Sequence, residues 1–117
     1  VYTAVGKAIM AQLEPEETEK IWHSTKIVQK TDKTITDYSL FLKELETVRK
    51  NGYATDCEEN ENGVCCVAAA VRDVYGEYRY AFSVSAPATR MNGETIKKVG
   101  NIVINTAERI SNGETEP

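Results

Sequence analysis

The feature that most constrains the fold is a pair of strand-like runs in the second half of the chain. The first reads VCCVAAAVR (residues 64–72) and the second reads YRYAFSVSA (residues 78–86). A short polar link, DVYGE, joins them and carries Gly76. Apolar, β-branched and aromatic runs separated by a few residues with a glycine are typical of a β-hairpin. The sequence therefore predicts an antiparallel sheet that the rest of the chain must cover.

The alternation of side chains along a strand divides the second run into two unlike faces. The large side chains of one face are expected in the core, and they belong to Tyr78, Tyr80, Phe82 and Val84. The opposite face is small or polar, and it carries Arg79, Ala81, Ser83 and Ser85. This strand therefore presents two hydroxyl groups at the end of its small face.

The first run is apolar on both faces, which predicts that other elements cover both sides of it. One of its faces carries Val64, Cys66, Ala68 and Ala70. Small side chains on a sheet leave room for a polar pocket, which a thiol and the two hydroxyls would line. They are also typical of tight packing between a helix and a sheet, so the pattern alone leaves both interpretations open.

Four further segments have helical patterns. Their expected bounds are residues 3–13, 14–24, 38–50 and 92–111. Thr3 is a suitable N-cap for the first helix, and Pro15 fits the first turn of the second. Asp37 is expected to cap the third helix, and Gly52 is expected to end it with a positive φ.

Residues 26–36 are polar and predict a loop, and residues 53–59 predict a further strand. Helices followed by strands and a closing helix indicate the α+β class, with helices packed against an antiparallel sheet. Three strands make a small sheet, and the first residues look like the middle of a helix. We therefore expect residues 1–117 to be part of a single domain of a longer protein.

Composition and charge exclude several functions for this segment. The 117 residues include 14 Lys and Arg against 18 Asp and Glu, which gives a net charge of -4. The basic residues are scattered, which argues against direct nucleic-acid binding, because neutralisation of phosphates dominates such affinity. No run approaches the roughly 20 apolar residues of a membrane-spanning helix, so we expect no membrane contact.

The number and placement of the cysteines predict a reducing environment. There are three, Cys57, Cys65 and Cys66, and two of them are adjacent in an apolar run. An odd number with this placement favours a reducing compartment, the cytoplasm, and buried free thiols.

Five segments, taken together, resemble the IclR-type bacterial and archaeal transcriptional regulators. In chain order they are GKAIMAQL, TITDYSLFLKELETVRKNGYATDCEE, GVCCVAAAVRD, AFSVSAPATRM and the final helix. The resemblance is to about the C-terminal two-thirds of the effector-binding domain, and it covers nearly the whole chain with the same order and spacing. It implies a GAF-like fold with a central antiparallel sheet flanked by helices.

The resemblance also implies a function. The domain would bind a small organic, sugar or aromatic acid and assemble into dimers or tetramers. DNA would be bound only by an N-terminal winged helix-turn-helix that is absent from this chain. No cofactor and no catalytic activity are implied.

The residues that the resemblance places around the effector are Ala4, Val5, Asp56, Cys66, Ser83 and Ser85. Hydroxyl and backbone N–H groups would donate to a ligand carboxylate. Asp56 would repel that carboxylate, so we expect it to meet a ligand hydroxyl or to be protonated. The chain departs from the family pattern at Cys65, where an arginine is common, and this removes one possible carboxylate anchor.

Two alternatives come from the cysteines. The possible zinc ligands are Cys57, Cys65, Cys66 and Asp56, together with His23. Adjacent cysteines on a strand, however, point to opposite faces. A catalytic Cys66 would need a base to form its thiolate. His23 is the only histidine, and no spacing ties it to Cys66.

Overall fold

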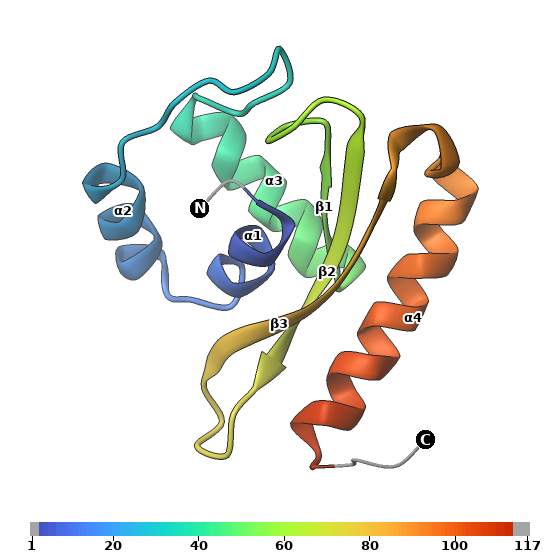
Figure 1. The fold of residues 1–117 in the computed structure, drawn as a ribbon. Helices are drawn as coiled ribbons and strands as arrows, with labels where there is room; N and C mark the ends of the chain where they lie inside the picture. Colours follow the sequence, from blue (N-terminus) through green and yellow to red (C-terminus); the bar gives the residue numbers. More distant parts are fainter. Residues whose placement is uncertain (1–2, 114–117) are drawn as a thin grey trace.

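The computed structural model describes residues 3–113, and it confirms the predicted α+β class (Figure 1). The elements are α1 (Ala4–Met10), α2 (Pro15–Ser24), α3 (Tyr38–Asn51), β1 (Ala54–Cys57), β2 (Val64–Arg72), β3 (Tyr78–Pro87), a short 3₁₀ turn (Ala88–Arg90) and α4 (Gly93–Ser111). The strands form an antiparallel sheet in the order β1-β2-β3. Among these residues, no helix is long and apolar enough to cross a membrane.

Helices cover both faces of the sheet, as the two apolar faces of β2 predict. Helices α1, α2 and α3 lie on one side and α4 lies on the other (Figure 1). Ala68 of β2 belongs to the core beneath α1 and α3, with Phe41 and Leu45. Val67 belongs to the core beneath α4, with Val103. The central strand is therefore shared by two separate cores.

The helix ends follow the predicted capping signals. The Thr3 hydroxyl accepts a hydrogen bond from Gly6 N at 3.0 Å. The Asp37 carboxylate accepts one from Ser39 N at 2.7 Å. Helix α3 ends at Gly52, which has a φ of 85° and so adopts the left-handed conformation that glycine permits. Local sequence therefore sets these three helix limits, whereas α1 ends at Met10, three residues before the predicted end at Leu13.

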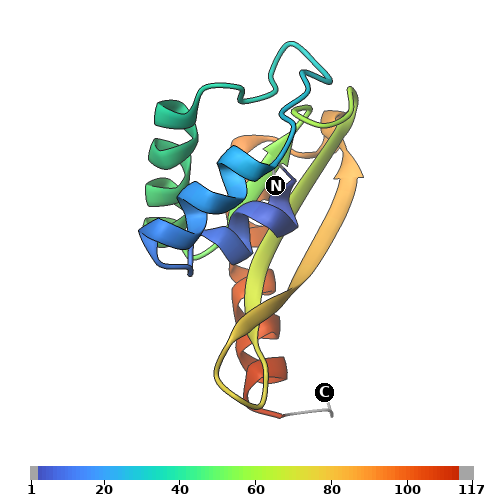
Figure 2. The same ribbon diagram turned by 90° about the vertical axis from the view of Figure 1, so that its left-hand side faces the viewer.

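The predicted core face of β3 is only partly correct. Phe82 and Val84 pack against the α4 core, but Tyr80 is 64% exposed. Tyr80 pairs with Val71 and Tyr78 pairs with Arg72, so Arg79 is an extra residue in this strand. This bulge lies between Tyr78 and Tyr80, so it turns Tyr78 to the opposite face. Tyr80 keeps the face of Phe82 and is exposed because it lies beside the end of α4, at Ile110. Figure 2 shows the tip of this hairpin extending along the C-terminal half of α4, where the sheet is narrow.

Strand β1 is shorter than the predicted span of residues 53–59. It ends at Cys57 because Glu58 adopts a φ of 61° and begins the turn to β2. Before the strand, the ring of Tyr53 lies directly against α4 at Gly100. A Cβ atom built on Gly100 would lie only 2.5 Å from Tyr53 Cε2. This glycine therefore permits the close approach of α4 to the sheet.

Replacing Gly100 with alanine is expected to destabilise the protein by about 1–3 kcal/mol, the usual cost of overpacking a core. Urea unfolding followed by circular dichroism measures the change. Gly93→Ala is the matched control, because nothing lies within 4 Å of its Cβ position. An equal effect of both substitutions would show that the Tyr53 contact does not limit the helix position.

Candidate functional site

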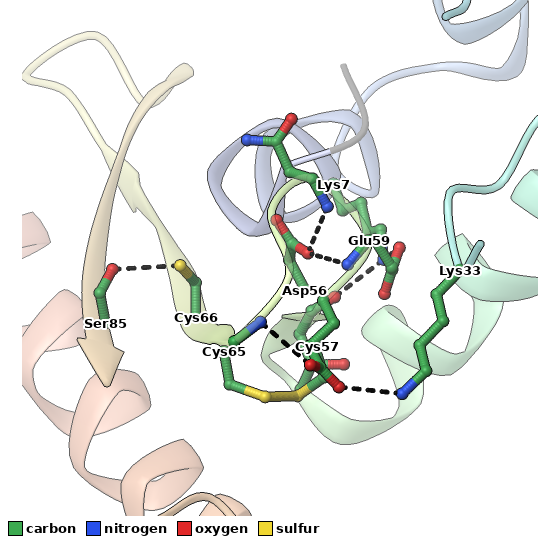
Figure 3. Close-up of a disulfide and its surroundings, with 12 residues drawn as sticks. Lys7, Lys33, Asp56, Cys57, Glu59, Cys65, Cys66 and Ser85 are labelled. Atoms are coloured by element: carbon green, nitrogen blue, oxygen red, sulfur yellow. Dashed lines mark hydrogen bonds and ion pairs between the residues drawn. A yellow bond between two sulfur atoms is a disulfide. The ribbon is translucent and has the colours of Figure 1, made fainter. Parts of the chain in front are cut away.

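Three of the predicted ligand residues form one row across the sheet. Asp56 of β1 pairs with Cys66 of β2, and Cys66 pairs with Ser85 of β3. Ser83 lies on the same face, two residues along β3 from Ser85, and pairs with Ala68. The Cys66 Sγ and Ser85 Oγ atoms are 3.1 Å apart, within hydrogen-bond distance (Figure 3). The antiparallel register thus brings together side chains that are far apart in the sequence.

Helix α1 covers the same face of the sheet, and the two predicted residues at its start differ in environment. Ala4 is buried in the core with Ala8, Ala54 and Ala68. Val5 is on the outer side of the helix and is 37% exposed. Small side chains on α1, β1 and β2 let the helix pack closely on the sheet. The tight-packing interpretation therefore holds for Ala4 and Ala68.

Asp56 has a structural role that the sequence analysis missed. Its side chain is buried, and its Oδ1 atom accepts hydrogen bonds from Glu59 N at 3.0 Å and Asn60 N at 3.2 Å. The carboxylate therefore holds the turn between β1 and β2 in an Asx-type arrangement.

Lys7 is the most deeply buried charged residue of the described chain, with 0% of its surface exposed. Its three N–H donors are all satisfied. The Nζ atom donates to Glu44 Oε2 at 2.7 Å, to Thr55 O at 2.8 Å and to Glu59 Oε1 at 2.6 Å. One ammonium group thus ties α1 to α3, to β1 and to the β1–β2 turn.

The sequence carries a signal for this buried lysine. Position 7 lies on the helical stripe of Ala4, Ala8 and Ala11, which are all buried. A lysine in the apolar stripe of a helix is almost never fully buried unless it is paired. The pattern could therefore have indicated a buried ion pair at Lys7.

Among the groups that contact Lys7, Glu59 is the one whose pKa is clearly shifted. Burial raises the pKa of Glu59, and the charges of Glu44 and Asp56 raise it further. Lys7 opposes this shift through its charge and its hydrogen bond, but burial has the larger effect.

The prediction of three free thiols is wrong for two of them. Cys57 and Cys65 form a disulfide, and Cys66 is free and half-buried (Figure 3). The crosslinked residues are paired in the β1–β2 register, and their Cα atoms are 4.1 Å apart. Glu58 N donates a hydrogen bond to Val64 O, so the adjacent Cys57–Cys65 pair is a non-hydrogen-bonded pair. Side chains of opposite residues approach most closely in pairs of this kind. Only the strand register reveals this pairing.

The two cysteine alternatives find no support in this geometry. Cys65 lies in the core beneath α4, whereas Cys66 lies on the opposite face, so adjacent thiols cannot share one ion. Within residues 3–113, no cluster of His, Cys, Asp or Glu is arranged to hold a metal. His23 is exposed on α2 and contacts Glu19 and Tyr38. Cys66 contacts Ser85 instead of an imidazole base.

The larger surface hollows lie away from the row of predicted ligand residues. A hollow of about 550 Å³ separates the α1–α2 corner, at Gln12 and Leu13, from the hairpin tip. Another of about 560 Å³ lies between the hairpin tip and the end of α4, at Tyr80 and Ile110. Neither hollow is lined by Asp56, Cys66, Ser83 or Ser85. Ser83 and Ser85 are exposed on β3, which is an edge strand here.

Comparison with known proteins places the chain in a family. Residues 1–112 match the family model of the bacterial transcriptional regulator IclR C-terminal domain. The chain belongs to this family. It is 36% identical over 109 residues to the HTH-type transcriptional repressor AllR of Escherichia coli K12, which covers 93% of this chain and 40% of the repressor. The chain thus spans well under half the length of this relative.

Solved structures of the family agree with the fold. The IclR structure from Thermotoga maritima has a TM-score of 0.91 and 34% identity, covering 98% of this chain and 47% of that one. The inducer-binding domain of PobR from Acinetobacter, solved as a 3-hydroxybenzoic acid complex, has a TM-score of 0.83 and 28% identity. That match covers 94% of this chain and 63% of the PobR domain. The relatives are named as transcriptional regulators.

Replacing Lys7 with methionine is expected to destabilise the protein by about 3 kcal/mol. This is the lower end of the cost of breaking a buried ion pair, because Glu44 and Glu59 keep some exposure to solvent. Urea unfolding provides the measurement. Lys33→Met is the control, because its ion pair with Glu58 is largely exposed and should matter far less. Equal losses from both variants would contradict a special role for Lys7.

The raised pKa of Glu59 predicts a pH-dependent stability. A group with a raised folded-state pKa stabilises the fold fully below its unfolded pKa, about 4.3 for glutamate. That contribution is lost as the pH rises through the folded-state value. The wild type should therefore lose stability relative to Glu59→Gln over this window. Chemical unfolding of both proteins at several pH values tests this, and a difference that stays constant with pH would contradict the shift.

Proposed function

We propose that this domain senses a small organic acid and belongs to a cytoplasmic transcriptional regulator. The supporting observation is that Asp56, Cys66 and Ser85 form one row on one face of the sheet. Ser83 lies on the same face, two residues along β3 from Ser85. Two hydroxyls and a thiol can donate hydrogen bonds to carboxylate oxygens. Asp56 adds a hydrogen-bond acceptor on β1, at the end of the row away from the serines. An acceptor there suits the hydroxyl group of a hydroxy acid.

The start of α1 completes this site in our proposal. Ala4 and Val5 lie where α1 begins, over the same face of the sheet. The serines are exposed on the edge strand β3. The relatives are longer than this chain, and residues beyond the matched region are proposed to close the site over these hydroxyl groups. A PobR domain that matches this chain is named for an inducer and bound to a hydroxylated aromatic acid.

In the whole protein, effector binding would act by a population shift. An N-terminal winged helix-turn-helix would bind DNA, and domains like this one would assemble dimers into tetramers. The assembly would exist in two arrangements, and the effector would bind one of them more tightly. This difference in affinity is what shifts the population between the arrangements. The domain would thus convert the concentration of a metabolite into a change in DNA affinity.

A thermal-shift screen of the purified protein against small organic, sugar and aromatic acids, 3-hydroxybenzoate included, is expected to identify stabilising ligands. Ser83→Ala and Ser85→Ala should each weaken the binding of a stabilising acid about tenfold or more. A hydrogen bond to a charged group contributes about 1.5–3 kcal/mol. Calorimetry gives the dissociation constants.

Ser39→Ala is the matched control, because Ser39 is exposed on α3, away from the row. Its dissociation constant should equal that of the wild type. Unchanged affinity in both β3 variants would remove the serines from the site, and the absence of any stabilising acid would argue against effector sensing by these residues.

A further inference from the structure

The disulfide between Cys57 and Cys65 lies on the rung next to the Asp56–Cys66 pair, in the same β1–β2 ladder (Figure 3). We propose that these two cysteines form a reversible redox site that controls the turn between β1 and β2. The site responds to small thiols and disulfides of the glutathione class. One premise rests on the proposed function. A regulator that acts on DNA works in the reducing cytosol, where disulfides are mostly transient or redox-sensing.

The two sulfur atoms differ in their access to solvent. Cys57 is half-buried, whereas Cys65 is only 3% exposed and packs in the core beneath α4. Thiol–disulfide exchange requires an incoming group to reach one sulfur atom. Cys57 is therefore the entry point, and Cys65 is the resolving partner that the strand register holds opposite to it.

Exchange with a small disulfide, RSSR, is balanced in two steps. The Cys57 thiolate attacks one sulfur of RSSR, forms a mixed disulfide and releases RS⁻. The Cys65 thiolate then attacks the Cys57 sulfur, closes the Cys57–Cys65 bond and releases the second RS⁻. Two electrons pass from the cysteine pair to RSSR, and the two thiol protons end on two RSH molecules. Reduction by excess thiol is the reverse of these steps.

The third thiol does not compete in this exchange. Cys66 follows Cys65 directly on β2, so its side chain points to the opposite face of the sheet. There it contacts the Ser85 hydroxyl at 3.1 Å. The register therefore permits one intramolecular pairing on this ladder.

Hydrogen bonds also hold the turn, so both redox states are expected to keep the native fold. The Asp56 carboxylate accepts from two amides of the turn. The Thr31 and Thr34 hydroxyls donate to the carbonyl groups of Glu58 and Glu59, respectively. These hydrogen bonds come from residues outside the crosslinked pair and do not involve its sulfur atoms.

The residue that responds first to reduction is Glu58. It follows Cys57 directly and has a φ of 61°, a conformation that is unfavourable for residues other than glycine. The crosslink restrains this position on its N-terminal side. Its removal lets Glu58 leave the strained conformation more often, which loosens the turn beside Asp56.

The test is a redox titration of the purified protein in buffers with different ratios of reduced to oxidised glutathione. Each sample is quenched with acid, alkylated under denaturing conditions and weighed by mass spectrometry. The oxidised protein carries one label, on Cys66, and the reduced protein carries three. We expect a transition between one and three labels within this series.

One label at every glutathione ratio would indicate a permanent structural crosslink and would overturn the proposal. Three labels at every ratio, or a stable glutathione adduct, would likewise overturn the proposal.

Two variants make the titration specific. Cys66→Ser should give a transition between no label and two labels at the same glutathione ratio as the wild type. Cys57→Ser should keep two labels at every ratio. A midpoint that moves in Cys66→Ser would assign the redox chemistry to Cys66 and overturn the proposed pair.

Amide hydrogen exchange then tests control of the turn. Reduction of the wild type is expected to accelerate exchange of residues 58–63 at least severalfold, with α4 unchanged as the control for global folding. Identical exchange in the two states would overturn the regulatory part of the proposal. Neither experiment uses an effector, so failure here is distinguishable from failure of the proposed acid-sensing function.

Discussion

The structure depends on the burial of strand β2 on both of its faces. One face meets α1 and α3, and the other meets α4, while β1 and β3 pair with the two edges of the strand. A shift of one residue in its register would exchange the two faces. Burial therefore fixes the register, and the register in turn aligns Asp56, Cys66 and Ser85.

The buried ammonium of Lys7 joins this sheet to the helices around it. An isolated charge in a protein core is costly, and it is tolerated only when it is paired and hydrogen-bonded. Here Glu44, Glu59 and the Thr55 carbonyl satisfy all three donors. Helix α1 and the β1–β2 turn, which flank the proposed effector site, are thereby joined in one hydrogen-bonded network.

The β1–β2 turn combines two kinds of restraint with different chemistry. Hydrogen bonds from Asp56, Thr31 and Thr34 hold its backbone. The disulfide holds the strand ends, and it is the only one of these restraints that thiols can remove. A site for small acids and a site for redox chemistry would thus share adjacent rungs of one ladder while using opposite faces of the sheet.

The sequence by itself determined the helices, the hairpin and the two-sided burial of β2. Capping residues such as Asp37 and the period of apolar residues act over a few neighbouring positions. It did not determine the exposure of Tyr80, the partners of Lys7 or the Cys57–Cys65 bond. Those depend on where α4 ends beside the hairpin, on contacts across 37 and 52 residues, and on strand register. Only the tertiary structure decides them, because local propensity carries no information about which distant groups meet.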